Sequence, residues 1–268
     1  EERVPFKKGV GRIYSELNIK CQPIAINSGT VWPKKGSLIK NKTITISILE
    51  AIEPGLDSKE FTNLIEKKIY SELERDFKNE KIGHLAKFNK AKIYFYTGNI
   101  DWAKAHLDIL KLATSKLIAN DAMKMSLLIT DNSNLDTSYD VIIMYAKAEY
   151  YFVKKEYEKS IYTLDSIIKG FPGHSIKDEI YLLKSNIYIE QDLYYSALQE
   201  IHKIIKNHYY DIICDEALFK YAEIIEKKHN EEEQAMEIYN KIITDFPNSI
   251  YAQKARKKYR KLRGDKDL

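Results

Sequence analysis

The side chains that could support acid–base, nucleophilic or metal chemistry are few in this chain of 268 residues, which contains six histidines and two cysteines. A catalytic histidine usually needs a carboxylate that orients its imidazole. No histidine here is followed by an aspartate five positions later; the six are His84, His106, His174, His202, His208 and His229. Cys21 and Cys214 are far apart and lack the spacing of a metal motif, so neither a disulfide framework nor a zinc site is expected.

Two short motifs point only weakly to ligand binding. Gly9-Val10-Gly11 could cradle a phosphate, but no strand is expected before it and a third glycine is missing. His174 and Asp178 could form a pair of ligands, although a solvated turn explains them better. We therefore predict no catalytic, cofactor-binding or metal-binding residues.

The composition excludes several classes of function. A net charge of +4 is too small to require a nucleic-acid partner. No apolar run approaches the ~20 residues that span a bilayer, and the sequence begins Glu1-Glu2-Arg3 without an apolar signal region. We expect no transmembrane segment in the given sequence, and a secretory signal that is either absent or lost with upstream sequence. The protein is then cytoplasmic or associated with the cell envelope.

One stretch, Glu156 to Pro172, sets the pattern for most of the chain. Its apolar residues recur at helical spacing, and Gly170 and Pro172 end the helix. The same stripe recurs twice, at intervals of roughly 37 residues, and such a period is typical of stacked helix pairs. The stripes are Tyr157, Ile161, Leu164, Ile167 and Ile168; Tyr194, Ala197, Ile201, Ile204 and Ile205; and Ala235, Ile238, Tyr239, Ile242 and Ile243.

A second helix precedes each stripe and carries a small residue where two helices would cross closely. An aromatic or apolar residue follows one turn later, as in Ala91 and Tyr94, Ala148 and Tyr151, Ser185 and Tyr188, and Ala222 and Ile225. This pattern resembles the tetratricopeptide repeat. Three positions depart from it, since Ser160 replaces Ala, Lys155 replaces Gly and Tyr209 replaces Pro.

The resemblance implies a mainly α fold, a right-handed superhelix of stacked antiparallel helix pairs over residues 76–268. The period breaks between Leu117 and Ser138. There a helix over residues 115–130 is predicted to stop at Asp131-Asn132-Ser133-Asn134, with no matching second helix before Tyr139. The helix over residues 249–263 is expected to cap the array. Its apolar face is Tyr251, Ala255, Tyr259 and Leu262, and its solvated face includes Lys257, Lys258 and Lys261. A basic patch for nucleic acid or anionic lipid is the rival interpretation of this helix.

Residues 1–75 have a different pattern, which predicts a small α/β piece. We expect a helix over residues 6–17, strands over 21–27 and 43–49, and a helix capped by Asp57 with Glu60 three positions later. The strands would belong to an incomplete sheet with one uncovered apolar face. Between them lies a basic loop that could touch anionic lipid, although a solvated loop is favoured; it contains Lys34, Lys35, Lys40 and Lys42.

Residues 1–72 are similar to the C-terminal end of a 1-acyl-glycerol-3-phosphate acyltransferase. The resemblance rests on Val4-Pro5-Phe6-Lys7-Lys8-Gly9, on Gln22 to Gly29 with Trp32, and on Glu53-Pro54-Gly55-Leu56. That family acts through a His-x4-Asp pair and a phosphate-binding Glu-Gly-Thr-Arg box, and the given sequence contains neither. The resemblance therefore implies ancestry rather than activity, with a natural fusion and a joined fragment both left open as origins.

The repeats predict a non-catalytic scaffold that binds a protein or peptide partner in a concave groove lined by the first helix of each pair. An acidic and apolar lining would suit a basic, partly hydrophobic partner. The alternative is a truncated or fused remnant of the acyltransferase of phospholipid synthesis. The expected groove residues are Phe88, Lys92, Phe95, Tyr145, Glu149, Phe152, Leu182, Asn186, Ile189, Phe219, Glu223 and Glu226.

Overall fold

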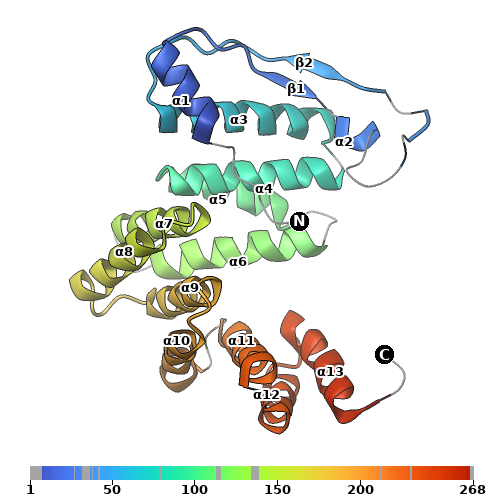
Figure 1. Cartoon of the computed structure of the whole chain (residues 1–268), viewed down its shortest axis with the longest axis vertical. Coiled ribbons are helices and arrows are strands. Elements are labelled where there is room, and N and C mark those ends of the chain that lie inside the picture. The colour runs from blue at the N-terminus through green and yellow to red at the C-terminus, as the bar shows by residue number, and fades with distance from the viewer. Residues whose placement is uncertain are drawn as a thin grey trace. The chain divides into compact units, whose positions relative to one another are not determined.

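The computed structural model describes residues 8–26, 28–31, 37, 39–41, 43–78, 80–112, 116–133, 139–209, 211, 213–229 and 231–265. The chain is mainly α-helical, with stacked antiparallel helix pairs and a small two-stranded piece near its N-terminus (Figure 1), which confirms the predicted fold class. It divides into two compact units, residues 1–146 and 147–268. No helix among the described residues is long and apolar enough to cross a membrane.

The first unit begins with α1 (Lys8–Leu17), β1 (Ile24–Ile26), the short α2 (Ser28–Val31), β2 (Ile46–Ile48) and α3 (Ser58–Asp76). The strands pair antiparallel, with Ile24 opposite Ile48, and an isolated bridge joins Cys21 to Ile52. Both strands are shorter than predicted, and within the described residues each has only the other as a neighbour.

A small core holds α1 and α3 together. The rings of Tyr14 and Phe61 stack 3.9 Å apart, and Ile52 and Ile65 complete the cluster. A Cβ added at Gly11 would lie 2.5 Å from the hydroxyl oxygen of Ser58. Gly11 is therefore needed for the close approach of α1 to α3, which is a packing reason for a glycine in the motif that resembled a phosphate cradle.

The outer face of the two strands is apolar and exposed. Ile24, Ile26, Ile46 and Ile48 are each more than half exposed, whereas Ala25 on the opposite side of β1 is 8% exposed. The predicted capping box at the start of α3 is present, since the Asp57 carboxylate accepts the backbone N–H groups of Lys59 and Glu60. Of the basic loop, Lys40 is exposed, while Lys34, Lys35 and Lys42 lie outside the described residues.

The rest of the first unit consists of α4 (Lys81–Tyr96), α5 (Ile100–Leu110), α6 (Lys116–Ser133) and the first half of α7 (Asp140–Val153). Helix α3 packs against α4, and α4 against α5. The domain boundary predicted at residue 75 lies in the last turn of α3 and stays a prediction. Helix α6 ends at Ser133, within the predicted stop at residues 131–134. Polar side chains there bond back to their own helix; the Asn132 amide donates to the Leu128 carbonyl at 2.9 Å.

The second unit contains the rest of α7, then α8 (Tyr157–Gly170), α9 (Lys177–Glu190), α10 (Tyr194–Asn207), α11 (Cys214–Ile224), the π-helical turn η1 (Ile225–His229), α12 (Glu232–Asp245) and α13 (Ile250–Arg263). No strand is present among its described residues, as predicted. One continuous core joins the helices from α9 to α13 and includes Ile201, Phe219 and Tyr239. Cys214 is buried in this core, and burial raises the pKa of its thiol to about 12.

Each helix pair carries two small residues, one on each helix, that are fully buried. All eight have 0% exposure: Ala91 with Ala103, Ala148 with Ser160, Ser185 with Ala197, and Ala222 with Ala235. The Ser160 hydroxyl donates a 2.8 Å hydrogen bond to the Ala148 carbonyl on the neighbouring helix. This bond explains how serine replaces the expected alanine, since it satisfies the hydroxyl of a fully buried side chain.

In several pairs, a residue with a left-handed backbone conformation precedes the second helix. Gly98, Lys155 and Asp192 have φ angles of 78°, 59° and 59° at equivalent positions. Lys155 and Asp192 therefore adopt, at some cost in conformational energy, the turn that glycine adopts freely in the first of these repeats.

The last helix, α13, packs against α12 and α11 as expected for a cap. Ala252 and Ala255 are buried, and Tyr251, Tyr259 and Leu262 are half-buried against the core. The prediction that Lys258 belongs to the solvated face is wrong, because its ammonium group lies 2.9 Å from the Glu226 carboxylate and its side chain is 24% exposed. The pattern of apolar residues in α13 could not predict this ion pair, because Glu226 lies in η1, which α12 separates from α13 in the sequence.

The Ser160 crossing leads to a stability prediction. Replacing Ser160 by Val adds bulk at a site with no exposed surface and removes the hydrogen bond to Ala148. We expect Ser160→Val to lower the free energy of unfolding by about 1–3 kcal/mol, in the range for an overpacked core. Denaturant unfolding measures this change. The control is Ser166→Val in the same helix, where the hydroxyl bonds only its own helix and a loss below ~1 kcal/mol is expected; equal losses would contradict the prediction.

Candidate functional site

The expected groove residues of the first unit lie mostly inside the protein. Phe88, Phe95 and Tyr145 are at most 7% exposed, and only Lys92 is half-buried. The Lys92 ammonium group lies 5.0 Å from the centre of the Phe88 ring. Lys92 therefore places a positive charge over the Phe88 ring. Because Phe88, Phe95 and Tyr145 are buried, they offer little surface to a partner.

In the second unit, the groove residues divide into buried and half-buried groups. Leu182 and Phe219 belong to the core, with Phe219 packed between the rings of Tyr239 and Tyr251 at 5.7 and 5.4 Å. The half-buried residues are Glu149, Phe152, Asn186, Ile189, Glu223 and Glu226. These half-buried side chains are the ones that retain surface for a partner.

The two acidic groove residues of the α11 and η1 segment already pair with lysines. Glu223 lies 3.3 Å from Lys227. Glu226 accepts a 2.6 Å hydrogen bond from the Tyr239 hydroxyl and pairs with Lys258 of α13. Burial opposes ionisation of Glu226, but the bonds from Tyr239 and Lys258 outweigh it and hold the pKa of this carboxyl below its ordinary value. Glu226 therefore links α12, α13 and the π-helical turn.

This network predicts how stability depends on pH. A carboxyl with a lowered pKa in the folded state stabilises the fold above the pKa of the unfolded chain, ~4.3 for Glu, and this contribution is lost as the pH falls through the folded-state pKa. We expect Glu226→Gln to destabilise the protein at pH 7 and to flatten the loss of unfolding free energy between pH 7 and pH 3.

The matched control is Glu223→Gln, because Glu223 pairs with a mostly exposed lysine and such pairs contribute little. Its unfolding curve should follow that of the unmodified protein throughout this range. Identical pH profiles for the Glu226 variant and the unmodified protein would contradict the assigned role.

A shallow hollow of about 390 Å³ lies in the second unit between α7 and α8, and sequence reasoning did not predict it. The ammonium groups of Lys147 and Lys159 lie 5.9 and 5.8 Å from the centre of the Tyr151 ring, and Tyr162 is 76% exposed. Tyr151 was expected only as a packing residue. The sequence could not reveal the hollow, because its residues come from two helices whose relative placement depends on the Ala148–Ser160 crossing.

His174 lies in the turn before α9, as the favoured interpretation of His174 and Asp178 expected. The Nδ1 atom of His174 accepts a hydrogen bond from the Ile176 backbone N–H at 3.2 Å, within the turn before α9. The side chains that gather around Asp178 are instead those of His208 and Asp211. Spacing along the chain could not predict that His208 and Asp211 lie near Asp178, because these residues belong to successive helix pairs.

Comparison with known proteins adds information about the repeat region. A family model described as "YfiO: Outer membrane lipoprotein" matches residues 119–265, which is more than half of the chain. The matched residues run from α6 through α13. A search of curated proteins finds no match.

Proposed function

The chain belongs to the YfiO outer membrane lipoprotein family, and we propose that it is a non-catalytic scaffold in outer membrane protein assembly that holds a protein partner on its helix-pair surface. Members of this family are tetratricopeptide-containing, non-catalytic proteins of the bacterial outer membrane that bind protein partners. The observation that carries the proposal is the coincidence of the family match with the stacked helix pairs of residues 119–265.

The binding surface that we propose consists of the half-buried groove residues of α7 and α9. Phe152, Asn186 and Ile189 combine apolar and amide surface, and each is a first-helix position of its pair. An extended segment or an amphipathic helix uses this kind of surface, because apolar anchors enter between side chains while polar groups fix the register. Membership of the YfiO family supports the proposal that the partner is a protein.

The chemistry of the partner is proposed to be partly hydrophobic. A basic partner was expected from the acidic groove residues, but Glu223 and Glu226 already pair with Lys227 and Lys258. Their charges are therefore largely compensated, and the apolar component of the partner should contribute more to binding than its positive charge does.

The N-terminal resemblance lies outside the matched residues. The similarity of residues 1–72 to an acyltransferase C-terminus, and a peripheral membrane contact through the basic loop, stay predictions about a separate part of the chain. We propose no acyl-transfer function from them.

Site-specific photocrosslinking in bacterial cells tests the proposed surface. A photoreactive phenylalanine analogue placed at Asn186 should crosslink to envelope proteins, including unfolded or partly assembled outer membrane proteins. The control position is His202, which is exposed on α10, the second helix of the same pair. Crosslinks at His202 that equal or exceed those at Asn186 would contradict binding on the first-helix surface.

A further inference from the structure

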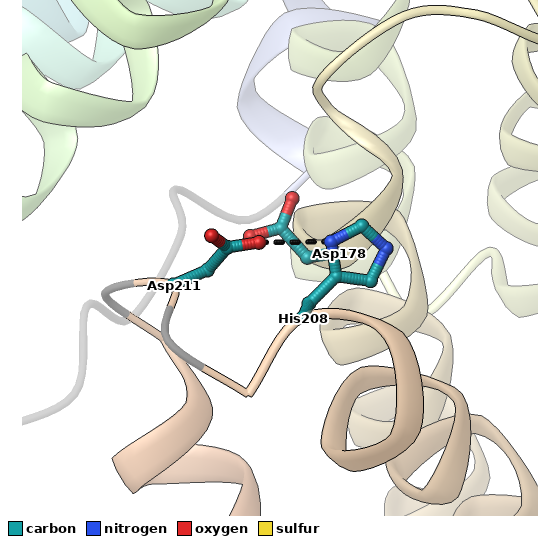
Figure 2. A group of neighbouring side chains, drawn as sticks. All are labelled: Asp178, His208 and Asp211. Carbon is teal, nitrogen blue, oxygen red and sulfur yellow. Dashed lines mark hydrogen bonds and ion pairs between the residues drawn. The ribbon is translucent and has the colours of Figure 1, made fainter.

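Three side chains that can ligate a metal converge where one helix pair meets the next. Asp178 lies in the first turn of α9, His208 directly follows α10, and Asp211 lies in the turn before α11. One ligand atom from each lies within 4.8 Å of the others. Figure 2 shows the two carboxylates on the same side of the imidazole, facing its Nδ1 atom.

Asp178 is the most buried member of the cluster. It is 7% exposed, whereas the side chains of His208 and Asp211 are 22% and 50% exposed. A carboxylate that is largely removed from water is stabilised when a cation lies within reach. The N-terminus of α9 favours a negative charge at this position, but it gives no reason for a second carboxylate and an imidazole to gather there.

The backbone fixes the other two ligands. The His208 N–H bonds the Ile204 carbonyl at 2.7 Å as α10 ends, and the Asp211 N–H bonds the His208 carbonyl at 3.1 Å. This turn places the His208 Nδ1 atom 2.8 Å from an Asp211 carboxylate oxygen. The Asp211 side chain is half exposed, so it can adjust around a bound ion and leave open positions for water.

We propose that Asp178, His208 and Asp211 bind a divalent transition metal ion of the zinc class. An imidazole nitrogen with carboxylate oxygens is a donor set that zinc accepts, whereas magnesium prefers oxygen ligands in an octahedral shell. Metal bonds of ~2.0–2.2 Å require the donors to close in, and rotation of the exposed Asp211 carboxylate provides this movement. Binding through Nδ1 requires neutral His208 to carry its proton on Nε2.

Such an ion would act as a clamp between repeats. It would join the first turn of α9 to the turn that connects α10 with α11, two segments about thirty residues apart in sequence. Because the three ligands come together only in the folded chain, the ion would stabilise the folded state. This inference is independent of the proposed scaffold function.

Calorimetric titration of the full chain with zinc chloride tests the site. The chain should carry Cys21→Ser, because Cys21 is partly exposed and its thiolate could bind zinc elsewhere, whereas Cys214 is fully buried. We expect one zinc ion per chain, weaker binding of magnesium, and a melting temperature that rises with zinc concentration. Asp211→Asn and His208→Gln should each weaken zinc binding at least ~10-fold, as loss of metal-site partners does.

Two controls separate the site from non-specific binding and from unfolding. His202→Gln removes an exposed histidine of α10, the helix that ends just before His208, and should leave zinc affinity unchanged. Asp211→Asn changes an exposed side chain, so it tests the site even if substitution of buried Asp178 unfolds the protein. No zinc binding by the parent chain, or equal affinities in the Asp211, His208 and His202 variants, would overturn the proposal.

Discussion

The close approach of paired helices at small buried residues is the constraint on which the repeat region depends. Each pair has an Ala or Ser on one helix and an Ala or Ser on the next, all with no exposed surface, and a hydrogen bond joins Ser160 to Ala148. Side chains of this size let two helix backbones approach until the flanking Ile and Leu stripes interdigitate. The stripe of one pair then needs the next pair to cover it, so the chain extends as an array.

Helix α13, the last helix that the structure describes, satisfies the same constraint with its own small residues. Helix α13 supplies Ala252 and Ala255 as its own fully buried small residues, and the half-buried Tyr251 packs on Phe219 of the preceding pair. Lys258 bonds the Glu226 carboxylate, which also accepts the Tyr239 hydroxyl. A helix that looks basic in sequence is therefore held by both apolar contacts and a partly buried ion pair, and this combination accounts for its role as a cap.

The repeats could be predicted from sequence because their spacing, small residues and apolar stripes are local patterns. The crossing of Ala148 with Ser160 follows from such a pattern, even though serine departs from the expected residue. Contacts between helices from different repeats could not be predicted in this way. Glu226 was expected to face a partner and pairs with Lys258, and Asp178 was considered with His174 but approaches His208. The groove list stays a prediction, since five of its twelve residues are buried and seven are half-buried.

Native-state hydrogen exchange of an Ala197→Leu chain tests the central constraint most directly. A leucine at this position should force α9 and α10 apart, because Ala197 is fully buried and α10 packs against α9. We predict faster exchange of backbone amides throughout α9 and α10, including those of Ile187 and Ile204, with a smaller change in α12. Unchanged protection of both helices would show that the small residues do not set the packing of the pair, and would contradict this account.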